Sequence, residues 1–184
     1  MTAMKLDPKY FNSFLAVVAV VAAAIIIFFT INSQQSKKAA FKRRILQQDS
    51  LKTVPWVMIE SADSLRIEDY EDQYVLLQFW SSWLDDPELI HRKLGKLQDA
   101  STPKLAILSA MVGFKKEEAV GYVEQQNLPI AFVVGSKQFS SFGVPGVPAY
   151  LLFSPEKEIS FISFGELNET QLDSLRNIVA GGRP

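Results

Sequence analysis

The sequence predicts an α/β domain with a mixed central sheet, carried on one N-terminal transmembrane helix. One long apolar stretch near the N-terminus contains no charged residue. Beyond it, short apolar runs typical of strands alternate with amphipathic segments typical of helices, and the chain closes with a hairpin and a helix. We therefore divide the chain into four parts: an N-terminal tail (1–13), a transmembrane anchor (14–31), a basic juxtamembrane linker (32–53) and a folded domain (54–181).

The apolar stretch from Phe14 to Ile31 has the length of a membrane span. At about 1.5 Å per residue it would extend roughly 27 Å, close to the thickness of a bilayer core. A cleavable signal peptide has a shorter apolar region, of about 7–15 residues, and ends in small residues. Ala22–Ala24 resembles such an end, but the apolar run Ile25–Phe29 follows it. A retained anchor in contact with membrane lipid is therefore the better interpretation.

Charge limits the classes of partner and gives a first prediction of orientation. A net charge of −1 argues against a nucleic-acid surface, so we expect no nucleic-acid partner. Lys5 and Lys9 precede the anchor, and a longer basic run follows it: Lys37, Lys38, Lys42, Arg43 and Arg44. This run is either a solvated helix or a surface for anionic lipid headgroups. The positive-inside rule applied to it predicts a cytoplasmic domain.

The expected strands are apolar runs bounded by turn residues. They are 56–59, 74–80, 104–111, 130–134, 149–153 and 159–164, with a further apolar patch at 65–67. Tyr74–Trp80 is nearly continuous in apolar residues, as expected of a strand buried on both faces. Ser154–Glu158 joins the last two strands as a hairpin.

The expected helices are recognised by their starts and apolar faces. Asp86-Pro87-Glu88 is typical of a helix start, because Asp caps free amides, Pro suits the first turn, and Glu meets the positive end of the dipole. Further helices are expected at 115–126, around 138–142 and at 168–179, with part of the linker helical through Phe41, Ile45 and Leu46. Asn168 and Gln171 have the spacing of a capping box. We expect His91 on an exposed helix surface.

Three segments in a fixed order carry a family resemblance. Ile67–Tyr70 precedes Tyr74–Trp80, the run Phe142–Leu151 reads FGVPGVPAYL, and Phe164–Leu167 precedes the last helix. The second segment is similar to the Tyr-Gly-Val-x-Gly-x-Pro-Thr-x-Phe-Leu pattern of the TlpA type of membrane-anchored thioredoxin-like proteins. These are bacterial thiol–disulfide oxidoreductases of the redoxin group. The resemblance spans about 53–180 and implies a thioredoxin-like fold, with a mixed central sheet flanked by helices.

The chain departs from this family at the residues that carry its chemistry. The family has Trp-Cys-x-x-Cys after its buried strand, whereas this chain reads WLDDP, so that Leu84 and Pro87 occupy the cysteine positions. The whole chain contains no cysteine. Thiol–disulfide exchange requires a thiolate, so the family's redox reaction is not available to these residues. The resemblance also implies that Pro148 is the family's cis-proline, followed here by Ala149 in place of Thr.

The resemblance implies that this surface receives an extended client segment. We expect an exposed apolar patch there, formed by Trp80, Trp83, Leu84, Pro148 and Tyr150. The candidate binding surface, with the neighbouring residues included, is Trp80, Trp83, Leu84, Asp85, Asp86, Pro87, Val147, Pro148 and Tyr150. Such patches often mark interaction sites. The alternative is that Leu84 merely fills a site that has fallen out of use.

Asp85, Asp86, Glu88 and His91 raise a second hypothesis of metal binding or acid–base chemistry. Side chains two positions apart on a helix do not face each other, and capping accounts for the acids. We find no converging ligand set. We therefore expect no catalytic residue, no metal site and no cofactor.

The sequence thus predicts a membrane-tethered, redox-inactive pseudoenzyme that acts as a binding or assembly factor through its degenerate site. Two alternatives stay open: a structural subunit of a membrane complex, or an oxidoreductase-related protein whose activity depends on a partner's thiols. By the family resemblance we expect a single-pass protein of the bacterial inner membrane. The same resemblance favours a periplasmic domain, against the charge asymmetry around the anchor.

Overall fold

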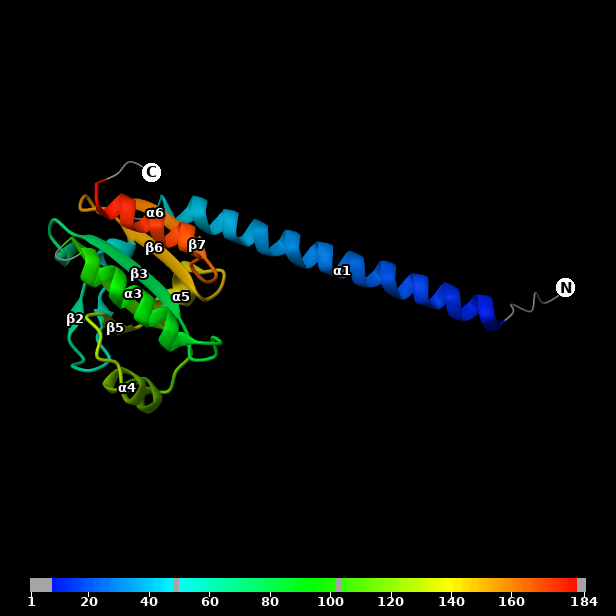
Figure 1. The fold of residues 1–184 in the computed structure, drawn as a ribbon, viewed down its shortest axis with the longest axis horizontal. Helices are drawn as coiled ribbons and strands as arrows, with labels where there is room; N and C mark the ends of the chain where they lie inside the picture. The colour runs from blue at the N-terminus through cyan, green and yellow to red at the C-terminus, as the bar shows by residue number, and fades with distance from the viewer. Residues whose placement is uncertain (1–7, 48–49, 102–103, 182–184) are drawn as a thin grey trace. The chain divides into compact units, whose positions relative to one another are not determined.

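The computed structural model describes residues 8–47, 50–101 and 104–181 (Figure 1). The chain forms two compact units, Met1–Ala40 and Phe41–Pro184. Residues 1–7 of the expected N-terminal tail, Lys5 among them, lie outside the described residues, and residues 8–13 are helical.

Helix α1 runs without a break from Pro8 to Ile45. Proline suits the first turn of a helix, and neither glycine nor a second proline interrupts the sequence before Ile45. The residues assigned to the start of a linker are therefore helical. From Phe11 onward this helix is long and apolar enough to cross a membrane, a property that a signal sequence shares.

The second unit begins earlier than the sequence indicated. Phe41 and Ile45, four positions apart on the last turns of α1, are 2% and 1% exposed, whereas Leu46 is 62% exposed. Leu51 on the short helix α2 (Ser50–Thr53) is also buried. These apolar side chains pack into the core, so the domain includes residues that we had assigned to the linker. Arg44, the last residue of the basic run, donates hydrogen bonds to the carbonyl oxygens of residues 142 and 143 in the domain.

A five-stranded mixed sheet forms the centre of the second unit, in the order β5-β4-β3-β6-β7. Its strands are β3 (Tyr74–Trp80), β4 (Leu105–Met111), β5 (Ala131–Val134), β6 (Ala149–Phe153) and β7 (Ile159–Phe164). Strands β3, β4 and β5 are parallel, while β6 and β7 are antiparallel to their neighbours. A separate two-stranded ladder pairs β1 (Trp56–Val57) with β2 (Ser64–Leu65). The mixed sheet expected from the sequence is confirmed.

A hydrophobic core lies on each side of this sheet. Side chains alternate along β3, so that Leu76 and Trp80 join one core while Val75, Leu77 and Phe79 join the other. The first core is covered by α3 (Pro87–Ser101), α4 (Lys116–Glu124) and α6 (Glu169–Val179), and α3 packs against α6 (Figure 1). The second is covered by α2, α5 (Ser136–Phe142) and the 3₁₀ turn η1 (Ile67–Asp69).

The capping box predicted for the last helix is present. The Asn168 side chain accepts a hydrogen bond from the Gln171 amide at 2.9 Å, and the Gln171 side chain accepts from the Asn168 amide at 3.0 Å. Two otherwise unpaired amides at the start of α6 are thus satisfied.

Candidate functional site

The connection between β3 and α3 is a turn fixed to the end of the neighbouring strand. Ser81 is fully buried, and its hydroxyl donates to the Val112 carbonyl at 2.6 Å. The Leu84 amide then donates to the Ser81 carbonyl at 3.2 Å, which closes the turn. The turn that begins at Ser81 is therefore held by the residue that follows β4.

Trp83 projects from this turn and is 64% exposed. Its indole lies against Gly113, because a Cβ placed on Gly113 would be 2.7 Å from a carbon of the ring. Gly113 has φ +78°, a conformation that favours glycine. Leu84 is half-buried and packs against the first core. A large aromatic surface is thus held open to solvent beside a leucine.

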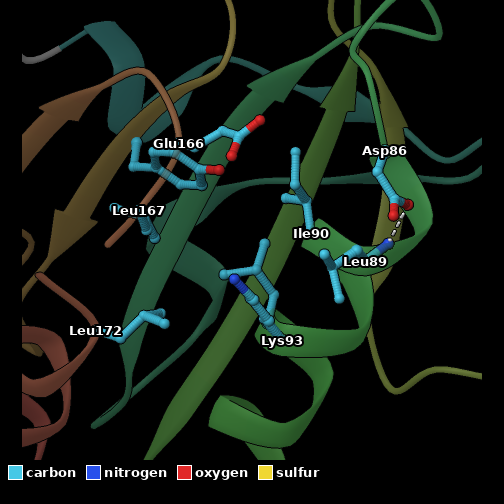
Figure 2. Close-up of a pocket in the computed structure, with 9 residues that line it drawn as sticks. Asp86, Leu89, Ile90, Lys93, Glu166, Leu167 and Leu172 are labelled. Atoms are coloured by element: carbon cyan, nitrogen blue, oxygen red, sulfur yellow. Dashed lines mark hydrogen bonds between the residues drawn. The ribbon is translucent and has the colours of Figure 1, made fainter. Parts of the chain in front are cut away.

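The acids after Trp83 have different contacts. Asp86 Oδ1 accepts a hydrogen bond from the Leu89 amide at 2.8 Å, as expected of a helix cap (Figure 2). Asp85, Asp86 and Glu88 are exposed. Among the described residues, no group of three or more His, Asp or Glu side chains is arranged to hold a metal ion.

The second half of the site is the loop before β6. The peptide bond between Val147 and Pro148 is cis, as the family resemblance implied. The Pro148 carbonyl accepts a hydrogen bond from the Gly165 amide at 2.8 Å, which ties this loop to the end of β7. Pro148 is buried and Val147 is half-buried, so of these two predicted residues only Val147 is open to a partner.

Three residues of the expected exposed patch are instead buried, Pro148 among them. Trp80 is 0% exposed and Tyr150 is 1% exposed, and both belong to the first core. Trp80 points to the same side of β3 as Leu76, where α3 and α4 cover it. Its ring centroid is 5.3 Å from that of Phe114 and 4.9 Å from that of Tyr122. The prediction that Trp80, Pro148 and Tyr150 are exposed is wrong.

His91 is also buried, against the prediction of an exposed position. Its Nε2 lies 2.9 Å from the Ser109 hydroxyl, and its Nδ1 lies 2.8 Å from the Tyr122 hydroxyl. Ser109 donates its proton to Gln78 Oε1 at 3.0 Å, so Ser109 accepts from Nε2–H and Nδ1 accepts from Tyr122. These four side chains form a polar network beneath Trp80, whose ring centroid is 4.3 Å from that of His91.

Burial determines the protonation of this network. Burial lowers the pKa of His91 to about 3, so the imidazole is neutral at physiological pH. Burial, followed by the nearby Glu88 and Asp86, raises the pKa of Tyr122. Near pH 7 both groups are therefore uncharged and hydrogen-bonded to each other.

The sequence did contain a signal for this network. Gln78 and Ser109 are polar residues inside otherwise apolar strands, and they are register partners across β3 and β4. Paired polar residues within buried strands indicate an internal hydrogen-bond partner. Tyr122 carried no comparable signal.

A small cavity separates α3 from the connection between β7 and α6 (Figure 2). Its volume is about 40 Å³, and its lining includes Asp86, Ile90, Lys93, Tyr150 and Glu166. Burial and then the charge of Glu166 raise the pKa of Tyr150, an effect that the Gln78 side chain partly offsets. A cavity of this size has room for one or a few waters and cannot enclose an organic cofactor.

Comparison with solved structures identifies the fold. No family model matches the sequence, and no curated protein matches it. The structure is similar to a secreted Mycobacterium tuberculosis disulfide oxidoreductase homologous to E. coli DsbE, with a TM-score of 0.59 and 15% identity over 73% of this chain and 99% of that one. It is also similar to a putative thiol:disulfide interchange protein DsbE from Chlorobium tepidum, with a TM-score of 0.59 and 15% identity over 71% and 94% of the two chains.

A third similar structure is a thiol:disulfide interchange protein from Bacteroides sp., with a TM-score of 0.57 and 18% identity over 70% of this chain and 88% of that chain. The chain therefore has a thioredoxin-like α/β fold, with a long apolar helix at its N-terminus. The sequence holds no cysteine, so its own residues supply no sulfur nucleophile for disulfide exchange.

Proposed function

We propose that this chain is a membrane-tethered, redox-inactive thioredoxin-like protein that binds a protein partner through the surface around Trp83. This Trp83 surface consists of Trp83, Leu84, Asp85, Asp86, Pro87 and Val147, the members of the predicted set that are exposed or half-buried. The observation that carries the proposal is the 64% exposure of Trp83 on a fixed turn.

An exposed tryptophan on a rigid support is suited to binding. Covering an aromatic side chain removes a large apolar area from water, and interface hot spots are enriched in tryptophan. The hydrogen bond from Ser81 and the contact with Gly113 hold the Trp83 turn in place. A partner would therefore lose little affinity to ordering this side of the interface.

The charges around Trp83 limit the partner further. Asp85, Asp86 and Glu88 are all exposed within five positions of the tryptophan. Like charges across an interface oppose association. The segment that binds here is accordingly neutral or basic, with an apolar residue opposite Trp83.

Membrane tethering by α1 belongs to the same proposal. We assign the domain to the periplasmic side of a bacterial inner membrane, since long domains translocate largely regardless of flanking charge. The basic run after the apolar stretch favours the cytoplasmic side, but Arg44 is engaged with carbonyls of the domain. An enzymatic reporter fused after Pro184 distinguishes the two orientations. Activity of a cytoplasm-only reporter would overturn the periplasmic assignment.

In-cell photocrosslinking of the full chain tests the binding proposal. A photoreactive phenylalanine replaces Trp83, an exposed aromatic position, and in a second strain it replaces Asp173 on α6, which is also exposed. A discrete adduct from position 83 alone is expected, and mass spectrometry would identify the partner.

The alternative, a structural subunit, gives a different pattern. A subunit held by other faces of the domain would form adducts from position 173 or co-purify stoichiometrically, with no adduct from position 83. Adducts from position 173 alone would overturn binding through the Trp83 surface. Stoichiometric co-purification with no adduct from position 83 would also overturn it.

A further inference from the structure

A second, larger cavity lies at the carboxyl ends of β4 and β5. Its volume is about 430 Å³, and it is enclosed by the segment joining β1 to β2, by those strand ends and by α4. In open α/β sheets, ligands commonly bind beyond the carboxyl ends of the strands. This volume lies within the range of small-molecule sites.

The cavity exists because the β1–β2 segment closes over the edge strand β5. Met58 pairs with Val133 in an isolated antiparallel bridge, and the Ile59 amide donates to the Phe132 carbonyl at 3.0 Å. The Met58 amide also donates to the Asp63 carbonyl at 2.8 Å, which closes the turn at 58–63 that forms one lip of the cavity. The wall is thus held by backbone hydrogen bonds.

The lining is apolar and open to a ligand. Its apolar members are Val57, Met58, Ile59, Ala62, Met111, Phe114, Ala119, Val120 and Val134. Val57 and Val134 are 39% and 47% exposed, and both line the cavity. A ligand that covered these two valines would gain from removing apolar surface from water.

The charges at the cavity decide which ligands it suits. Among the described residues that line it, the charged ones are Glu60 and Lys115, which are exposed and of opposite sign. A charged ligand group placed among the apolar side chains, beyond these two exposed residues, would lose its hydration without an ionic partner. The interior therefore favours an uncharged ligand.

We propose that this cavity binds one neutral lipophilic molecule, an aliphatic chain with at most an uncharged polar head, taken up from the membrane phase. The apolar helix on the same chain, which can cross a membrane, would keep the cavity close to that source. This site is separate from the proposed protein-binding surface, although the two share a wall. Phe114 lines the cavity and packs on Trp80, while the preceding residue, Gly113, contacts Trp83.

Photoaffinity labelling of the full chain in lipid nanodiscs tests this proposal. The probe is decyl alcohol carrying a diazirine, and labelled peptides are mapped by mass spectrometry. Labelling of α1 is expected from the lipid phase. Within the domain, adducts should concentrate on the peptides that carry Met58, Phe114 and Val120.

Three variants keep the test decisive. Val120→Phe fills the cavity from α4, Val134→Lys places a charge at its exposed mouth, and Glu118→Phe adds the same ring at an exposed position of the same helix. Cavity labelling should fall about tenfold in the first two, equivalent to roughly 1.4 kcal/mol of binding free energy, and stay unchanged in the third. If Val120→Phe does not fold, Val134→Lys still tests whether the probe binds in the cavity.

Three results would overturn the proposal. One is labelling spread evenly over the domain. Another is cavity labelling that Val134→Lys leaves intact. The third is stronger labelling by the matching decanoic acid probe, which would contradict a neutral ligand. Each result is independent of the adduct at position 83, so the two proposals succeed or fail separately.

Discussion

Trp80 and Trp83 are three residues apart and have opposite environments. Trp80 is fully buried between α3 and α4, above a neutral network of hydrogen bonds, whereas Trp83 is 64% exposed on the turn that follows. In the inner region, around Trp80, every contact that we describe stabilises the fold. In the outer region, around Trp83, the indole ring is held in solvent with no comparable packing. This contrast separates residues needed for folding from residues free to bind.

The largest expected effect is the loss of the inner tryptophan. Trp80→Ala should lower the free energy of unfolding by about 3–5 kcal/mol, because it leaves a cavity among His91, Phe114, Tyr122 and Phe132. Chemical denaturation of the full chain measures this change. A loss below about 1 kcal/mol would contradict the packing described for the inner region.

The buried histidine predicts a dependence of stability on pH. His91 titrates near pH 6.5 when unfolded but only near pH 3 when folded, so below pH 6.5 the unfolded chain binds the extra proton. Stability is then full above pH 6.5 and falls by about 1.4 kcal/mol for each pH unit below it. Unfolding measured between pH 7 and pH 5 should show this slope, while His91→Gln should flatten it. Equal slopes in the two proteins would show that His91 is not held neutral.

The two adjacent acids at the start of α3 should behave differently. Asp86→Ala removes the carboxylate that accepts from the Leu89 amide, so stability should fall by about 1 kcal/mol. Asp85→Ala is the matched control, because Asp85 is exposed, and its effect should stay within about 0.5 kcal/mol. Thermal unfolding of both variants measures the difference. Equal losses would mean that the two acids share the capping role.

The smallest expected effect on stability is at the outer tryptophan. Trp83→Ala should change the free energy of unfolding by no more than about 0.5 kcal/mol. Its effect on binding should be large, with a fall of about tenfold or more in the adduct formed by a photoreactive probe at Asp85. Retention of that adduct would show that the partner does not use the tryptophan.

The fold was predictable because its strands are apolar runs separated by clear turns. Tyr74–Trp80, Ala149–Phe153 and Ile159–Phe164 are strands at the positions that the sequence indicated. The capping box at Asn168 was predictable for a similar reason, since it depends only on local spacing.

The interior of the site was harder to predict. A strand buried on both faces has no polar alternation, so the pattern of β3 did not show where Trp80 would point. His91 precedes Leu94 by three positions and therefore shares its apolar helix face, but its polarity favoured an exposed position. The large cavity depends on where the β1–β2 segment lies over β5, and this long-range pairing has no local signal in the sequence.

The arrangement of the three tryptophans makes the chain its own optical reporter. Trp56 and Trp80 are both 0% exposed, so the indole that a water-soluble quencher can reach is that of Trp83. Red-shifted fluorescence that acrylamide quenches would accordingly come from the proposed binding surface, and the remaining blue-shifted emission from the interior. A partner that covers Trp83 would remove the quenchable component, without any label added to the protein.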